Sequence, residues 1–192
     1  MSREDRERWD ARYARGSHYG VAPPAAFLEE LEPYLPTGGR VLDLAGGAGR
    51  NGVWFAERGF EVTVADVSPV GLQIAHERAR AAGVFIETLV LDLEREALPR
   101  GPWEVAFCLL YFEPRVFAQV EAVLAPGGLF AFSQPTTTNL ERHPRPPARF
   151  LVAPGQVPAL VPPGLETLVY REAWEPSTGQ HEARLIARRR SP

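Results

Sequence analysis

The sequence of 192 residues has little or none of several residue types on which protein chemistry often depends. Its single cysteine, Cys108, excludes an internal disulfide and fits a reducing compartment such as the cytoplasm. All 21 basic residues are arginines, so any chemistry based on lysine is excluded. The four histidines are scattered and show no metal-ligand spacing, so we predict no metal site.

Long apolar runs and a strong net charge are also missing. No apolar run approaches the roughly 20 residues that a membrane span needs, and the N-terminus is too charged for a signal peptide. The net charge of -3 gives no bulk attraction to nucleic acid. We therefore expect a cytoplasmic protein without a membrane or nucleic-acid partner, either a monomer or a homodimer.

The sequence does contain a glycine-rich stretch, RVLDLAGGAGRNG, over residues 40–52. It begins with a short apolar run that is typical of a buried parallel strand. Five small residues, 45–49, follow, and a helical pattern resumes at Asn51. A strand, a turn of small residues and a helix bring backbone N–H groups close to a bound ligand. The stretch therefore predicts a ligand-binding loop.

Two kinds of ligand are compatible with this loop. Gly47, Gly49 and Gly52 form the pattern G-x-G-x-x-G, the fingerprint of dinucleotide-binding proteins. However, Asp43 precedes the loop, and its carboxylate would repel a pyrophosphate. It would suit a ligand with an ammonium group or a sulfonium cation, and S-adenosylmethionine (SAM) has both. An NAD-dependent oxidoreductase stays open as the alternative.

The stretch resembles motif I of the class I SAM-dependent methyltransferases, whose pattern is [D/E]-x-G-x-G-x-G. Asp43, Gly47 and Gly49 match this pattern, and Ala45 replaces its first glycine. The form DLAGGAGRN looks most like the DLGCGxGRN variant of the tellurite-resistance and thiopurine methyltransferase-like branch. The resemblance implies SAM as the cofactor and S-adenosylhomocysteine (SAH) as the product.

Strand and helix signals alternate along the rest of the chain, which predicts a doubly wound parallel sheet. The later strands are expected at residues 61–66, 84–92, 103–112, 125–134, 165–175 and 181–190. The last two form a closing hairpin with one antiparallel strand, which is how methyltransferase domains end. The predicted fold is therefore α/β, a Rossmann-like doubly wound seven-stranded sheet with six parallel strands, one antiparallel strand and an N-terminal helical lid.

We expect one methyltransferase domain over residues 1–192. Residues 1–37 would form the N-terminal helices and the lid, and residues 38–192 the SAM-binding core. Residues 135–163 are rich in threonine, proline and arginine. We interpret them as a functional insert, because long loops in compact domains are usually functional or disordered.

Further residues are assigned to the cofactor. Asp66 ends the second strand, where a carboxylate can accept hydrogen bonds from both ribose hydroxyls. The resemblance implies that Asp92 accepts from the adenine amino group, that the N–H of Leu93 donates to the ring, and that Trp9 and Tyr13 fold over the cofactor. The full predicted cofactor-binding set is Trp9, Tyr13, Asp43, Ala45, Gly46, Gly47, Gly49, Asn51, Asp66, Val67, Asp92, Leu93 and Leu109.

The acceptor pocket is predicted beside the cofactor, where open α/β sheets bind ligands. Tyr19, Tyr111, Phe112 and Arg145 are its predicted wall residues, and the arginines of residues 142–149 would make one rim positive. The hypothesis is SAM-dependent methylation of a small molecule, such as a thiol, a chalcogen or an anionic nucleophile. No catalytic residue is assigned. A SAM- or SAH-binding protein without turnover is a second alternative.

Overall fold

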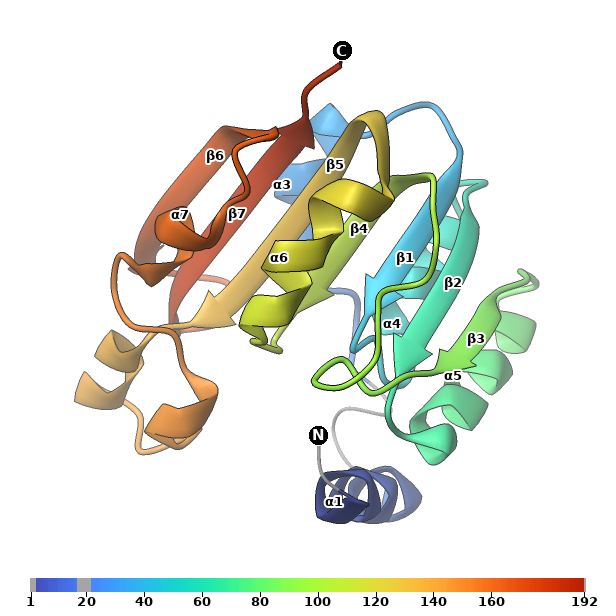
Figure 1. The fold of residues 1–192 in the computed structure, drawn as a ribbon. Coiled ribbons are helices and arrows are strands. Elements are labelled where there is room, and N and C mark those ends of the chain that lie inside the picture. Colours follow the sequence, from blue (N-terminus) through green and yellow to red (C-terminus); the bar gives the residue numbers. More distant parts are fainter. Residues whose placement is uncertain (1–2, 17–21, 192) are drawn as a thin grey trace.

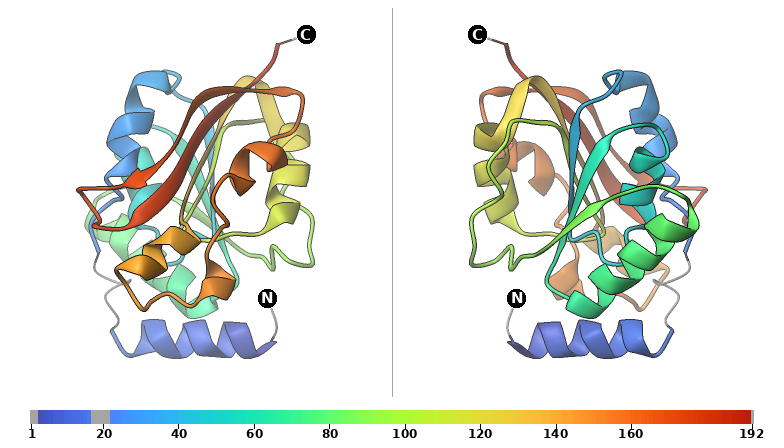
Figure 2. Two further views of the ribbon diagram at one scale, coloured as in Figure 1. Left: turned by 90° about the vertical axis from the view of Figure 1, so that its left-hand side faces the viewer. Right: turned by 90° about the vertical axis from the view of Figure 1, so that its right-hand side faces the viewer.

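The computed structural model describes residues 3–16 and 22–191, which form one seven-stranded sheet with helices on both faces (Figures 1 and 2). The strands lie in the order β3-β2-β1-β4-β5-β7-β6. Only β7 runs antiparallel to its neighbours, so six strands are parallel and one is antiparallel. The predicted fold class is confirmed.

The strands lie close to the positions that the sequence predicts. Their bounds are β1 Arg40–Leu44, β2 Glu61–Asp66, β3 Glu87–Val90, β4 Trp103–Leu109, β5 Leu124–Pro135, β6 Leu165–Trp174 and β7 His181–Arg189. β3 is shorter than predicted because it lies at the sheet edge and pairs only with the last four residues of β2. β4 ends three residues early, because Leu110 turns the chain with a φ of 61°.

Helices cover both faces of this sheet. Their bounds are α1 Arg3–Ala14, α3 Phe27–Leu31, η1 Glu32–Tyr34, α4 Arg50–Ala56, α5 Pro69–Ala81, α6 Pro114–Val123, η2 Thr137–Glu141, η3 Ala148–Phe150 and α7 Gln156–Leu160. α6 and α7 pack on one face, whereas α3, α4 and α5 pack on the other (Figure 2). No helix of the described residues is both long and apolar enough to span a bilayer.

The two faces bury separate aromatic cores. On the α6 side, the Phe117 ring contacts those of Phe130 and Phe132, with centroids 5.3 and 5.0 Å apart. On the α4 side, Phe55 stacks on Phe107 at 5.1 Å. These side chains alternate along β4 and β5, as strands covered on both faces require. The sheet is therefore a rigid layer whose carboxyl-terminal edge can position a site.

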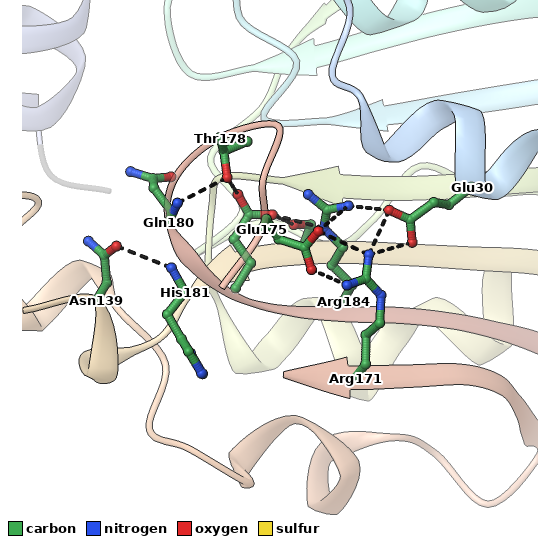
Figure 3. A network of polar contacts seen from close by, with 10 residues as sticks. Glu30, Asn139, Arg171, Glu175, Thr178, Gln180, His181 and Arg184 are labelled. Atoms are coloured by element: carbon green, nitrogen blue, oxygen red, sulfur yellow. Dashed lines mark hydrogen bonds and ion pairs between the residues drawn. The ribbon is translucent and has the colours of Figure 1, made fainter. Parts of the chain in front are cut away.

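A network of ion pairs, buried at Arg184 and partly exposed at Arg171 and Glu30, fixes the β6–β7 hairpin against α3 (Figure 3). Arg184, on β7, pairs with Glu175 at 3.1 Å and with Glu182 at 2.9 Å. Arg171, on β6, reaches Glu30 of α3 at 2.7 Å. Removing one partner from such a buried network strands an unpaired charge. The network therefore holds the C-terminal hairpin and the segment before β1 in one arrangement.

Candidate functional site

A cleft lies at the carboxyl ends of the central strands, and Trp9 and Tyr13 of α1 form part of its wall. Figure 1 shows α1 next to these strand ends. The chain runs from β1 to β2 on one side of β1 and returns through β4 on the other, so strand order reverses here. Open α/β sheets bind ligands at such a switch point. The walls of the cleft are Trp9, Tyr13, Ala45, Gly46, Ala48, Arg50, Asn51, Asp66, Leu109, Leu110 and Tyr111.

The glycine-rich turn forms the floor of the cleft. Ala45, Gly47 and Gly49 have φ values of 56°, 53° and 69°, in the left-handed region that favours glycine. Ala45 adopts this conformation although it has a Cβ, which costs of the order of 1 kcal/mol. A Cβ on Gly46 would come within 2.5 Å of the Asp43 carboxyl carbon. The turn is therefore closely packed, with its backbone against the cleft.

Asp66 joins the turn to the start of α5. One carboxylate oxygen accepts from the N–H of Gly47 at 2.9 Å, and the other accepts from the N–H of Ser68 at 2.8 Å. Burial raises the pKa of the Asp66 carboxyl to about 6, although the hydrogen bonds from Ser68 and Gly47 act in the opposite direction. The backbone N–H of Val67 also favours the ionised carboxylate, and the side chain lines the cleft, where a ligand can reach it.

We expect cofactor binding to depend on the ionisation of Asp66. The ribose hydroxyls of a nucleoside donate hydrogen bonds, so they bind the ionised carboxylate better than the neutral acid. Affinity for 5′-methylthioadenosine, which has a ribose but no amino-acid group, should therefore fall below about pH 6, by about tenfold per pH unit. Isothermal titration calorimetry from pH 7.5 down to the acid limit of stability, ~5, measures this.

The effect of the same carboxyl group on folding has the opposite sign. Its pKa is raised on folding, so its bound proton stabilises the native state below pH 3.8. This contribution is lost as the pH rises through about 6. Protonation of Asp66 near pH 5 therefore does not destabilise the fold, and it cannot weaken ligand binding by unfolding the protein. Affinity that stays constant between about pH 5 and 7.5 would contradict a role for Asp66 in ribose binding.

Asp43 lies below the turn and does not line the cleft. It is 1% exposed, and its carboxylate accepts from the N–H of Gly52 at 3.1 Å, at the start of α4. Burial raises the pKa of this carboxyl well above its usual range, although the hydrogen bond from Gly52 opposes the shift. Asp43 thus fixes the turn to α4, and its role toward the cation of the ligand stays a prediction.

The N-terminal helix covers the cleft through Tyr13. Its ring lies over two glycines, since a Cβ on Gly47 would meet the Tyr13 hydroxyl oxygen at 2.0 Å and one on Gly71 would meet the ring at 2.8 Å. Tyr13 is 8% exposed, and its ring stacks with that of Trp9 at 5.9 Å. Asp10 accepts a hydrogen bond from Ser68 Oγ, the N-cap of α5. α1 is therefore docked on the turn and on α5.

The segment after β4 supplies the opposite wall. Leu109 and Leu110 line the cleft together with Tyr111, and Cys108 is buried behind them. Burial raises the pKa of the Cys108 thiol above its usual range, so it stays protonated and is not a nucleophile. Burial also raises the pKa of Tyr111, and acidic neighbours, first Glu94, add to this. Its phenol is therefore neutral.

Other predicted cofactor residues lie beside the cleft rather than in its wall. Val67 and Leu93 are buried. Asp92 is 9% exposed, and its carboxylate accepts from the N–H of Glu94 at 3.0 Å. Asn51 does line the cleft, and its side-chain oxygen accepts from the N–H of Ala25 at 2.9 Å. The cofactor roles of these residues stay predictions.

The predicted acceptor residues are only partly brought together. Tyr111 lines the cleft, but Phe112 packs into the core against Phe117 and Phe132, with centroids 6.4 and 6.1 Å apart. Tyr19 lies outside the described residues. Arg145 is exposed, and its carbonyl oxygen accepts from an asparagine side chain, at 3.2 Å.

Two arginines of the expected positive rim stack on aromatic rings, and a role of the rim toward an acceptor stays a prediction. Arg142 stacks on the Trp174 ring, with its guanidinium carbon 3.8 Å from the centroid, and Arg149 stacks on Phe150 at 4.6 Å. Neither arginine lines the cleft. Trp174 lies far from Arg142 in the sequence, and Phe150 only follows Arg149 along the chain. The sequence therefore predicts neither stacking contact.

Three wall residues were not predicted from the sequence: Ala48, Arg50 and Leu110. Ala48 and Arg50 lie within the glycine-rich stretch, so their position in motif I could have indicated them. Leu110 gives no such signal, because its left-handed φ follows from the end of β4. Among the described residues, no group of three or more histidine, cysteine, aspartate or glutamate side chains could hold a metal ion.

The cleft fits an adenosyl cofactor by its chemistry. Asp66 presents carboxylate oxygens beside a turn whose left-handed glycines leave no room for a Cβ. Aromatic rings of Trp9 and Tyr13 cover it. A ribose, a purine and a polar tail would find suitable partners here.

Comparison with known proteins agrees with this chemistry. Residues 41–128 match the family described as "Methyltransferase domain". A curated relative, the ubiquinone/menaquinone biosynthesis C-methyltransferase UbiE of Bordetella parapertussis, is 34% identical over 99 residues, which cover 47% of this chain and 38% of the relative. The chain thus spans about two fifths of the length of that relative.

Solved structures share the fold over almost the whole chain. The [4+2]-cyclase SpnF has a TM-score of 0.79 at 16% identity, over 100% of this chain and 97% of its own. A TehB-like SAM-dependent methyltransferase of Corynebacterium glutamicum has a TM-score of 0.67 at 15% identity, over 97% of both chains. The comparisons confirm the predicted resemblance to methyltransferases over residues 41–128, and the solved structures share the predicted fold.

Proposed function

We propose that this chain, whose fold and central segment are those of the class I SAM-dependent methyltransferases, transfers a methyl group from SAM to a small-molecule acceptor. The observation that supports the proposal best is the arrangement around Asp66. A buried carboxylate, a left-handed glycine turn and two aromatic rings of α1 line one cleft at the switch point of the sheet.

The cofactor roles follow from these positions. Asp66 would accept hydrogen bonds from the ribose hydroxyls, and Asp92 and the N–H of Leu93 would contact the adenine. Trp9 and Tyr13 would cover the cofactor and keep water out. Leu109 would lie beside the methionine portion. When bound, SAM supplies a methyl group that is already activated by its sulfonium.

The chain's own contribution is therefore alignment rather than acid–base chemistry. The titratable groups in the described cleft wall are Asp66, Arg50, Tyr13 and Tyr111, and the phenol of Tyr111 is held neutral. Holding two reactants in line and excluding water can supply a large part of a rate enhancement. This favours acceptors that are nucleophilic near neutral pH, such as thiols, chalcogen anions or other small anions.

A small acceptor is also favoured by the cover over the cleft. α1 lies across the carboxyl ends of the strands, and the insert of residues 135–163 lies beside it (Figure 2). A folded protein or an RNA duplex would need an open approach. The net charge of -3 adds no attraction to nucleic acid. Because a [4+2]-cyclase shares this fold, turnover must be tested directly.

The test is methyl transfer from labelled SAM to a panel of small thiols, selenite, tellurite, carboxylates and phenols, with tRNA and a cell-free protein mixture as further acceptors. We expect SAH to accumulate with at least one small acceptor and label to appear in the product. Methyl transfer only to tRNA or protein would contradict the small-molecule proposal. Micromolar NAD binding without SAH binding would instead support the oxidoreductase alternative.

A further inference from the structure

Three buried polar atoms lack a hydrogen-bond partner; the side chains of Arg8 and Gln134 both contact Phe150, and that of Tyr111 lines the cleft. Within residues 3–16 and 22–191, the buried side-chain nitrogen and oxygen atoms without a partner are Arg8 Nε, Tyr111 Oη and Gln134 Oε1. Folded proteins leave few such atoms unpaired, because each loses its hydrogen bonds to water. Such atoms therefore indicate places where a ligand can bind.

Gln134 is the most deeply buried of the three. It lies near the end of β5 and is 3% exposed. Its Nε2 donates to the carbonyl oxygen of Phe150, in the insert. This contact fixes the orientation of the amide, so the unpartnered Oε1 is a hydrogen-bond acceptor.

Tyr111 lies just beyond the neighbouring strand. β4 and β5 pair Leu109 with Ser133, so Tyr111 and Gln134 follow adjacent strand ends. Both belong to the α6 face of the sheet: Tyr111 packs against the core of that face, and Gln134 is two residues after Phe132 of the same core. Because its pKa is raised, the Tyr111 hydroxyl is a proton donor at neutral pH.

Arg8 reaches the same region from α1. Its Nη2 pairs with Asp5 at 2.7 Å, which leaves Nε without a partner. The guanidinium carbon lies 5.5 Å from the centroid of the Phe150 ring, so Phe150 contacts both Arg8 and Gln134. The next residue along α1, Trp9, lines the cleft together with Tyr111. Figure 2 shows α1 beside the insert at this edge.

We propose that Arg8, Tyr111 and Gln134 form the binding site for the methyl acceptor, and that this acceptor is a small flat molecule with an O–H or N–H donor next to an oxygen acceptor. The proposal rests on the proposed function. The donor would bind Gln134 Oε1, and the oxygen would accept from the Tyr111 hydroxyl and Arg8 Nε. The aromatic rings of Trp9, Tyr111 and Phe150 favour a flat molecule. Catechol and 2-hydroxybenzoate (salicylate) both present this pair of groups. The carboxylate of salicylate is a nucleophile near neutral pH without a base, as the proposed function requires, and catechol probes binding of the same pair without the charge.

The experiment measures binding of three probes, catechol, salicylate and benzoate, to the full chain saturated with SAH. Titration calorimetry or ligand-observed NMR gives the dissociation constants. We expect catechol or salicylate to bind, and benzoate, which lacks the O–H donor, to bind at least tenfold more weakly than salicylate. Catechol binding alone would show that the site binds the donor–acceptor pair without a charge, and salicylate binding alone that it requires the carboxylate; either supports the site.

Variants then assign the binding to the three residues. Tyr111→Phe removes only an unpartnered hydroxyl, so the melting temperature should stay the same or rise. We expect the dissociation constant of the bound probe to rise at least tenfold while that of SAH stays within twofold. Tyr34→Phe, on η1 and outside the cleft, is the matched control. Arg8→Gln should weaken the probe similarly, with the exposed Arg6→Gln of the same helix as its control.

Gln134→Leu is the third variant. It removes the amide oxygen but also frees the Phe150 carbonyl, so its melting temperature is measured alongside. If SAH binds but neither catechol nor salicylate does, or if Tyr111→Phe leaves probe affinity unchanged, the site is overturned and the proposed function stands. If SAH itself fails to bind, the proposed function fails first.

Discussion

Replacing Asp66 with alanine is expected to weaken SAH binding by about 30-fold to 1,000-fold, or about 2–4 kcal/mol. The carboxylate would accept hydrogen bonds from both ribose hydroxyls in a desolvated wall, and such charge-assisted bonds are the strong ones. Titration calorimetry with SAH, at a pH well above the Asp66 pKa of about 6, measures the loss.

The same substitution is expected to have a second effect, on the turn. Sequence alone suggests that Asp66 only binds ligand, and thus that stability should change little. In the structure, its two oxygens accept from the N–H groups of Gly47 and Ser68, so alanine leaves both without a side-chain acceptor. Each unpaired buried N–H costs about 1–3 kcal/mol. Part of this cost is offset, because alanine also removes a carboxylate whose ionised form is disfavoured by burial.

Two further variants separate these effects. Asp66→Asn keeps one side-chain oxygen and removes the charge. The free energy of SAH binding should therefore change more than the free energy of unfolding measured in urea. Glu61→Ala, at the exposed opposite end of β2, is the matched control and should change neither. If Asp66→Ala binds SAH within twofold of the wild type, Asp66 is only a turn residue.

The parts of the site that sequence predicts are those fixed by local pattern. The turn of residues 45–49 follows the buried strand β1, and Asp66 is the last residue of the alternating strand β2. The carboxyl ends of parallel strands meet at one edge of the sheet. Their place in the cleft could therefore be inferred from the order of strands and helices alone.

The parts that sequence does not predict depend on packing between distant segments. Arg8 meets Phe150 across 142 positions, and no local pattern indicates it. Gln134 reads as one polar residue at a strand end, and only its contact with the insert leaves its oxygen free. Phe112 and Tyr111 are adjacent aromatics, and only the turn at Leu110 sends one into the core and the other to the cleft.

The lid proposed for α1 can be tested by Gly71→Ala. Gly71 lies in the first turn of α5, and a Cβ there would meet the Tyr13 ring at 2.8 Å. Its φ is not in the left-handed region, so α5 itself accepts alanine and gains about 0.5–1 kcal/mol of helix propensity. The substitution therefore displaces α1 without altering the turn or Asp66. Gly47→Ala would not separate these effects, because Gly47 has a φ of 53° within the turn.

If α1 covers the cofactor, Gly71→Ala should weaken SAH binding by about tenfold, because the wall formed by Tyr13 is lost, while urea unfolding of the core changes by less than about 1 kcal/mol. Limited proteolysis at Arg12 and Arg15 gives the second measurement. SAH should protect the wild-type chain from cleavage and protect the variant much less. Gly38→Ala, where a Cβ meets no atom within 4 Å, is the control and should behave as wild type. Two results together would contradict a lid: equal cleavage of the wild type with and without SAH, and unchanged SAH affinity in Gly71→Ala. In that case α1 only packs on α5 and takes no part in binding.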